Sequence, residues 1–231
     1  MIADLKNIPS LPSPIAFSIG MFDGMHPGHL ALLQQVRLRG TSVVLTFSNH
    51  PNRTPLVCTI DHKLRLLQKS VDLILLEPFT PAFSEQPFDQ FLTDLQRTLP
   101  FSHLILGEGA SFGKNREGTP DKVMQLANKL SFTAKYIQKY LFYGKPISSQ
   151  RIRSAIESGQ LDLAAKLLQR PYSILAPIKK GVMHLPDLCL PPDGDYSVHC
   201  FDQKMTARIC RAAHTLKLSS DLNHSLAEVI F

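Results

Sequence analysis

The sequence has few of the features that mark secreted, metal-stabilised or membrane-spanning proteins. Its four cysteines lie far apart and form no C-x-x-C pair: Cys58, Cys189, Cys200 and Cys210. This spacing argues against a zinc ribbon or a thioredoxin motif and favours reduced thiols. No stretch approaches the roughly 20 apolar residues of a membrane helix, and residues 1–10 lack the apolar core of a secretory signal. These absences predict a soluble, cytoplasmic protein without a membrane partner.

Charged residues are also few, and their distribution is uneven. They make up 19% of the 231 residues against 44% hydrophobic residues, which excludes a disordered or collagen-like chain. The formal net charge is +6. Residues 114–168 carry ten basic and four acidic groups, whereas 1–113 carry eight and nine, and 169–231 carry seven and six. A local basic excess predicts a bound anion, because a chain that coats nucleic acid is usually basic more widely.

The hydrophobic pattern predicts an α/β fold with a Rossmann-like parallel sheet. Continuous apolar runs of strand length alternate with amphipathic helical stretches, which is typical of a parallel sheet covered on both faces. The strands are expected at 15–19, 42–47, 73–76, 103–106 and 132–137, and the helices at 30–36, 61–69, 87–99 and 120–130. Ligands of such sheets bind at the carboxyl ends of the strands, so the loops after these strands are the candidate site.

The character of the chain changes near residue 169. Two further helices are expected at 148–158 and 161–168, after which prolines cluster and short β-like runs appear at 196–201 and 205–209. At about 150 residues per domain, the length corresponds to roughly one and a half domains. We therefore expect a complete domain over residues 1–168 and a small C-terminal β module over residues 169–231.

The loop after the first strand reads GMFDGMHPGH and runs directly into a helix. Glycines let a backbone approach an anion, and a helix N-terminus directs N–H groups and a positive dipole toward it. His26 and His29 add two imidazoles at this turn. An isolated pair of histidines three apart is more often a pair of surface or cap residues, and no third ligand with suitable spacing supports a metal pair. Their position after a first parallel strand favours nucleotide binding.

This loop resembles the G-x-F-D-G-x-H-x-G-H signature of the flavin-adenylylating H-x-G-H nucleotidyltransferases, the N-terminal domain of bacterial riboflavin kinase/FAD synthetase. The resemblance recurs in order over residues 15–175. TFSNHP at 46–51 is similar to the family's T-F-x-P-H-P, and the loop at 107–118 to its G-x-D-F-x-F-G-x-x-x-x-G. ISSQRIR at 147–153 is similar to I-S-S-T-x-I-R. The sequence departs from these patterns at Asn49, Gly109, Ala110 and Gln150.

The resemblance implies an FMN adenylyltransferase that makes FAD and pyrophosphate from ATP and FMN, with Mg²⁺ accompanying ATP and no protein metal ligand. It implies that His26, His29 and Arg153 are catalytic. The residues implied for ATP are Gly20, Phe22, Asp23, Gly24, Ser148, Ser149 and Arg151. Those implied for FMN are Thr46, Phe47, Asn49, His50, Gly107, Phe112, Lys114 and Arg116. Asp23 is open between orienting the loop and approaching the metal.

The tail begins RPYSI at 170–174, which resembles the opening of the family's riboflavin kinase domain, but the kinase segment G-x-P-T-A-N is absent. A reduced, kinase-inactive β module is therefore expected, covering apolar surface or supporting a homo-oligomer. Three alternatives stay open. The chain is bifunctional if the module retains kinase activity, a catalytically weak flavin- or nucleotide-binding module if the departures abolish turnover, or a transferase for another phosphorylated acceptor. Nucleic acid is not an expected partner, because no reader motif is present.

Overall fold

The structure, a computed structural model, describes residues 1–50 and 54–231. By their contacts the residues divide into two compact units. The first comprises residues 1–21, 28–52 and 67–140, and the second comprises 22–27, 53–66 and 141–231. The candidate ATP loop is thus divided in sequence: Gly20 and Met21 belong to the first unit, and Phe22 to Pro27 belong to the second. The boundary expected after residue 168, from the change in character of the chain, stays a prediction.

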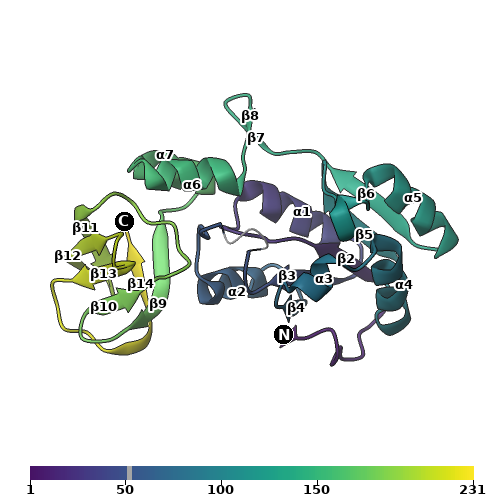
Figure 1. Cartoon of the computed structure of the whole chain (residues 1–231), viewed down its shortest axis with the longest axis horizontal. Helices are drawn as coiled ribbons and strands as arrows, with labels where there is room; N and C mark the ends of the chain where they lie inside the picture. The colour runs from purple at the N-terminus through teal and green to yellow at the C-terminus, as the bar shows by residue number, and fades with distance from the viewer. Residues whose placement is uncertain (51–53) are drawn as a thin grey trace. The chain divides into compact units, whose positions relative to one another are not determined.

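The first unit contains a six-stranded, all-parallel sheet with flanking helices (Figure 1). In sheet order the strands are β1 (Ile2–Ala3), β4 (Leu73–Glu77), β3 (Thr41–Phe47), β2 (Ile15–Ile19), β5 (His103–Gly107) and β6 (Thr133–Ile137). The helices of this unit are α1 (Pro27–Arg37), α3 (Pro81–Ser84), α4 (Phe88–Thr98) and α5 (Pro120–Lys129), whereas most of α2 (Ile60–Gln68) belongs to the second unit. The Rossmann-like sheet predicted from the apolar runs is confirmed.

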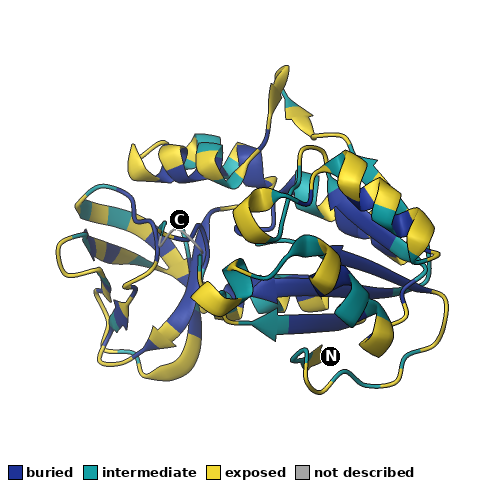
Figure 2. Ribbon diagram, turned by 45° about the vertical axis from the view of Figure 1, so that its right-hand side comes forward, coloured by how far each residue is buried: buried dark blue, intermediate teal, exposed yellow. Residues whose placement is uncertain are grey.

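The central strands are buried on both faces, which explains their continuous apolar sequences. β3 is buried at six of its seven positions, and Figure 2 shows the strands of the sheet in dark blue beneath partly yellow helices. α4 packs Phe91, Leu92 and Leu95 into the same core. The order of connection reverses at β2, because β3 lies on one side of it and β5 on the other. Such a switch point is where parallel sheets bind ligands.

The second unit contains a barrel-like antiparallel sheet. In sheet order its strands are β10 (Val182–His184), β13 (Thr215–Leu218), β12 (Gln203–Cys210), β11 (Gly194–Cys200), β14 (His224–Ile230) and β9 (Ser173–Ile178). Two helices, α6 (Ser149–Glu157) and α7 (Leu161–Leu168), and a short hairpin of β7 (Leu141–Phe142) and β8 (Lys145–Pro146) precede it. The C-terminal β module is confirmed, with strands at 173–178, 182–184, 215–218 and 224–230 beyond those expected.

One hydrophobic core joins the elements of this second unit. It contains Ile152 and Ile156 of α6, Leu167 of α7, and inward-facing residues of the barrel-like sheet. Leu56 and Val57, which precede α2 in the sequence, belong to the same core. The segments 22–27 and 53–66 are therefore packed with the C-terminal part of the chain. Among the described residues, no helix is long and apolar enough to cross a membrane.

Candidate functional site

The loop that follows β2 begins on the parallel sheet. The Gly20 N–H donates to the Leu45 carbonyl at 3.0 Å, and the Thr46 hydroxyl donates to the Met21 carbonyl at 3.1 Å. Leu45 and Thr46, the partners in these two hydrogen bonds, lie near the end of β3. Thr46, which the resemblance assigns to FMN, is buried, and its hydroxyl fixes the start of the loop.

The continuation of this loop has an unusual backbone. Phe22, Gly24 and Met25 have φ angles of 48°, 76° and 41°, in the left-handed region. The conformation costs a non-glycine residue on the order of 1–2 kcal/mol, and here two non-glycine residues adopt it. A Cβ on Gly24 would lie 2.8 Å from the Val57 side chain. All three residues are buried, so contacts with the rest of the second unit must hold this conformation.

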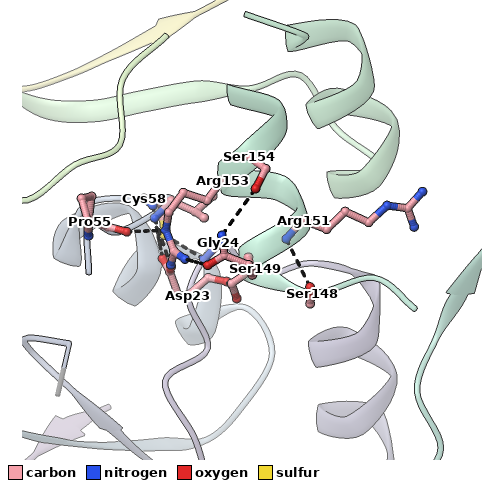
Figure 3. Close-up of polar contacts among 11 residues, drawn as sticks. Asp23, Gly24, Pro55, Cys58, Ser148, Ser149, Arg151, Arg153 and Ser154 are labelled. Atoms are coloured by element: carbon pink, nitrogen blue, oxygen red, sulfur yellow. Dashed lines mark hydrogen bonds and ion pairs between the residues drawn. The ribbon is translucent and has the colours of Figure 1, made fainter. Parts of the chain in front are cut away.

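Asp23 supplies several of those contacts (Figure 3). Its Oδ1 accepts hydrogen bonds from the N–H groups of Val57 at 2.8 Å and Cys58 at 3.4 Å. Its Oδ2 lies 3.1 Å from Nη2 of Arg153, and its carbonyl accepts the Ser149 hydroxyl at 2.9 Å. Burial raises the pKa of Asp23, while the Val57 N–H and Arg153 oppose that shift. The carboxylate thus joins three segments of the second unit: the loop, the stretch ahead of α2 and the start of α6.

Arg153 and its neighbours come from the start of α6. Ser148 is the N-cap and accepts the Arg151 N–H at 3.2 Å. Arg153 is 5% exposed and donates to the Pro55 carbonyl at 2.6 Å and to Oε1 of Gln150 at 2.7 Å. Gln150, which replaces the family's threonine, therefore supports Arg153 directly.

Arg151 points away from Asp23, as Figure 3 shows. Its Nη1 donates to the carbonyls of Phe142 at 3.4 Å, Lys145 at 3.2 Å and Pro146 at 3.4 Å. The guanidinium also lies over the Phe142 ring, 5.9 Å from its centroid. Arg151 therefore holds the β7–β8 hairpin against the start of α6.

The two histidines of the motif lie in different surroundings. His26 is buried, and desolvation, followed by the nearby charge of Arg170, lowers its pKa to about 4. The ring is therefore neutral at pH 7, and a neutral imidazole has one N–H to donate and adds no positive charge. His29 lies in the first turn of α1 and is half-buried.

Sequence reasoning did not identify three ionisable residues of the second unit near this loop. Desolvation lowers the pKa of the buried Lys63, and it raises the pKa of the Cys58 thiol to about 12. Cys58 accepts the Gly24 N–H at 3.3 Å. Arg170 donates to the carbonyls of Gly24 at 2.9 Å and Met25 at 3.3 Å. The sequence gives no local signal for Cys58 or Lys63, and Arg170 stood out only as part of RPYSI.

The first unit contains a separate feature, a pocket of about 560 Å³ at the carboxyl ends of β2, β3 and β5. Its lining is mainly apolar and aromatic. The lining includes five predicted site residues. Phe47, His50, Phe112 and Arg116 are those that the resemblance assigns to FMN, and Gly20 is one that it assigns to ATP. This volume lies within the range of about 300–1,000 Å³ that is typical of small-molecule sites.

Asn49 organises one wall of this pocket. Its Nδ2 donates to the Phe79 carbonyl at 3.0 Å, and its Oδ1 accepts the Phe79 N–H at 2.8 Å. The Phe79 ring packs edge-on against Phe47, with centroids 5.0 Å apart, and Phe83 packs on Phe47 at 5.1 Å. Asn49, where the family has proline, thus secures an aromatic wall. Pro51, the last residue of that motif, lies outside the described residues.

The loop after β5 forms another wall. Phe112 and Gly118 form an antiparallel bridge, and a Cβ on Gly113 would lie 2.6 Å from Phe88. Arg116 donates from Nε to the Ser111 hydroxyl at 2.9 Å, beside the pocket. Lys114 instead forms an exposed ion pair with Glu85 at 2.8 Å, and Gly107 ends β5. The Lys114 ammonium is thus paired with the Glu85 carboxylate, whereas Arg116 lines the pocket.

Within residues 1–50 and 54–231, no group of three His, Cys, Asp or Glu side chains is placed to hold a metal ion. Asp23, the carboxylate of the motif, is already used by Val57 and Arg153.

Residues 8–151 match the family model of FAD synthetase, and this range includes the aromatic pocket and the loop that carries Asp23. The chain belongs to the FAD synthetase family. A bifunctional riboflavin kinase/FMN adenylyltransferase from Buchnera aphidicola is 28% identical over 258 aligned positions, covering 99% of this chain and 83% of the relative.

Two other relatives and one crystal structure extend this comparison. An FAD synthetase from Listeria monocytogenes is 28% identical and covers 78% of each chain. The bifunctional riboflavin kinase/FMN adenylyltransferase of Escherichia coli K12 is 29% identical, over 78% of this chain and 63% of the relative. A crystal structure described as a macrolide-efflux protein from Streptococcus pneumoniae has the same fold, with a TM-score of 0.78 at 21% identity, over 100% of this chain and 88% of the other.

Proposed function

We propose that the chain is an FMN adenylyltransferase that makes FAD and pyrophosphate from ATP and FMN. The observation that carries the proposal is the aromatic pocket in a member of the FAD synthetase family. Phe47, Phe79 and Phe83 form a tight group of rings, which suits a planar flavin. Arg116 at the edge of the pocket offers charge-assisted donors for the FMN phosphate.

In the proposed reaction, a phosphate oxygen of FMN attacks the α-phosphorus of ATP in line. The bond from that phosphorus to the bridging oxygen breaks, and pyrophosphate leaves. This chemistry needs positioning and charge stabilisation and no covalent enzyme intermediate. Magnesium enters as part of the MgATP substrate, held by the phosphate oxygens and water. The chain's own part is to bind and orient both substrates.

We assign His26 and His29 to the α- and β-phosphates of ATP, where His26 donates as a neutral imidazole. Gly20, Phe22 and Gly24 shape the backbone around the nucleotide. Ser148, Ser149, Arg151 and Arg153 are assigned to the β/γ side. Arg153 uses three of its N–H groups within the protein, so we propose that it acts through its charge and its remaining N–H groups. Asp23 is proposed as the residue that orients the loop.

For FMN, we keep the full set expected from the sequence and assign two kinds of role. Phe47, His50, Phe112 and Arg116 line the pocket, and Thr46, Asn49 and Gly107 hold its walls. Lys114 is assigned to FMN only if the flavin phosphate displaces Glu85 from it. We further propose that ATP and FMN are the partners, that nucleic acid is not, and that the protein is cytoplasmic; a homo-oligomer stays a prediction.

The test is to incubate the purified protein with MgATP and FMN and to measure FAD and pyrophosphate. We expect both products, and absence of both would refute the proposal. FMN binding without turnover would favour the catalytically weak binding module, and pyrophosphate with another acceptor would favour a different transferase. Riboflavin in a parallel reaction tests the bifunctional alternative. We propose that the reduced module has no kinase activity, so no FMN should form from riboflavin.

Replacement of the motif histidines tests the assignment of the phosphates. His26→Ala and His29→Ala should each lower kcat by about 10²–10³, the usual cost of losing a donor that stabilises transition-state charge. The control is His199→Ala, because His199 is an exposed residue of β11 and should keep full activity. Unchanged turnover in a motif variant would remove that histidine from the mechanism.

A further inference from the structure

Arg170 connects the C-terminal β module to the H-x-G-H loop within the second unit. Its Nη2 donates to the Gly24 carbonyl at 2.9 Å and its Nη1 to the Met25 carbonyl at 3.3 Å. Gly24 and Met25 are two of the three left-handed residues of the loop. The next residue along the chain is His26, so the guanidinium holds the two peptide groups that lead directly to that imidazole.

The fork geometry of arginine matters for this contact. Two consecutive carbonyl oxygens require two donors at a fixed separation, which a planar guanidinium supplies and a single ammonium does not. Because a trans peptide group is rigid and planar, a fixed carbonyl also fixes the direction of the N–H on the other side of the same bond. Arg170 therefore determines the orientation of the Met25 and His26 N–H groups together.

The backbone of Arg170 is itself firmly held. Gln169 ends α7 in a left-handed conformation with a φ of 53°, and the Arg170 N–H donates to the Ala165 carbonyl at 3.3 Å. Tyr172, two residues later, is buried, and its hydroxyl donates to the Cys189 carbonyl at 3.3 Å. The side chain thus projects from a rigid junction between α7 and β9, and the strain of the loop is balanced by a fixed partner.

We infer that Arg170 is a positioning residue for adenylyl transfer, which acts by fixing the Gly24 and Met25 carbonyls and through them His26. This inference rests on the proposed function. It also gives the β module a role that needs no kinase activity: the module supplies and anchors the residue that sets the nucleotide loop. The residue touches neither substrate, and its effect is on the geometry of the loop that does.

The test compares Arg170→Met with Arg211→Met in the full-length protein. Arg211 is a matched control because it also donates to backbone carbonyls in the second unit, those of Leu190, Pro191 and Glu157, and none belongs to the loop. Both variants should unfold at a lower temperature. Only Arg170→Met should lower kcat per folded molecule, by roughly 10²-fold, with the KM for FMN unchanged. Arg170→Lys should recover only part of the rate.

Amide hydrogen exchange gives a readout that does not depend on turnover. Amides of residues 22–29 should exchange faster in Arg170→Met than in wild type, and at the wild-type rate in Arg211→Met. If wild type makes no FAD, the proposed function fails, and the exchange comparison still decides the role of Arg170. A folded Arg170→Met with normal kcat and normal exchange overturns the inference. If Arg170→Met does not fold, the same measurements on Arg170→Lys decide it.

Discussion

At the scale of single residues, Asp23 ties the candidate ATP loop to two other segments of the second unit. Its carboxylate accepts two backbone N–H groups ahead of α2 and pairs with Arg153 from α6. The pair is almost fully buried, with side-chain exposures of 2% and 6%. Buried pairs of this kind add little net stability when intact, but removal of one partner strands a charge away from water.

Asp23→Ala should therefore lower the free energy of unfolding by about 3–5 kcal/mol, because Arg153 keeps its charge in a buried site. Denaturant unfolding of the purified variant measures the loss. The matched control is Asp94→Ala, which breaks the exposed ion pair of Asp94 with Arg97 and should cost less than about 1 kcal/mol. Equal losses in the two variants would contradict the structural role given to Asp23.

Asn49 illustrates a departure from the family pattern that has a structural reason. In place of a rigid proline, its amide makes two hydrogen bonds with the backbone of Phe79. Each such bond contributes on the order of 1 kcal/mol, enough to keep the Phe79 ring against Phe47.

Asn49→Ala should consequently weaken FMN binding about five- to tenfold, because the aromatic wall becomes less ordered and 1.4 kcal/mol corresponds to a tenfold change. Quenching of flavin fluorescence on titration with protein measures the affinity. Asn7→Ala is the control, since Asn7 is exposed and hydrogen-bonds only to Asp4 in the contacts described. An unchanged FMN affinity in Asn49→Ala would show that the position of the Phe79 ring does not affect FMN binding.

At the scale of elements, the loop between β5 and α5 depends on its glycines to different degrees. Gly109 and Gly113 have nearly equal φ angles, 75° and 77°. A Cβ on Gly109 would meet nothing within 4 Å, whereas one on Gly113 would lie 2.6 Å from Cβ of Phe88 and 2.7 Å from its backbone nitrogen. The family's aspartate is missing at the position that has room for a side chain.

Because Gly109 and Gly113 have nearly the same φ, an alanine meets the same backbone strain at either position, and only its side-chain contacts differ. Gly109→Ala should cost about 1–2 kcal/mol, the price of a left-handed alanine, and keep FMN binding. Gly113→Ala should cost more and abolish FMN binding, because the start of α4 must move away from the loop. Unfolding and flavin titrations of both variants test this, and similar behaviour of the two would show that the contact with Phe88 does not constrain the loop.

At the scale of the whole molecule, stability is linked to pH through two buried histidines of the second unit. Desolvation lowers the pKa of His26 and of His62 to about 4, below the ordinary 6.5. Both rings are neutral in the folded protein, while the unfolded chain takes up protons below pH 6.5. The unfolded state therefore gains stability as the pH falls through this window.

The free energy of unfolding should be constant above about pH 6.5 and fall between pH 6.5 and 4, by up to about 3 kcal/mol for each histidine. Denaturant unfolding at pH 7.5, 6 and 5 measures the slope. His62→Gln should flatten part of it, whereas His199→Gln, at an exposed position, should leave it unchanged. A slope unaffected by His62→Gln would show that the pKa of this residue is the same in the folded and unfolded states.

Much of the fold could be predicted from the sequence because the signals are local. Apolar runs such as 42–47 mark strands buried on both faces, and the amphipathic stretch 87–99 becomes α4. Strands β9 and β14 were not predicted, since Ser173–Ile178 contains a proline and His224–Ile230 begins with an exposed half. Their pairing with each other is a long-range contact that no local pattern reveals.

The sequence by itself determined the parallel sheet, the family resemblance and the motif residues, because periodicity and spacing are properties of neighbouring residues. Only the tertiary structure decided that Asp23 binds Val57 and Arg153, that Lys114 pairs with Glu85, and that Arg170 donates to the carbonyls of Gly24 and Met25. These contacts join residues separated by tens to more than a hundred positions. Their partners are selected by burial, since a polar group removed from water must be satisfied by whichever donor or acceptor the packed core brings to it.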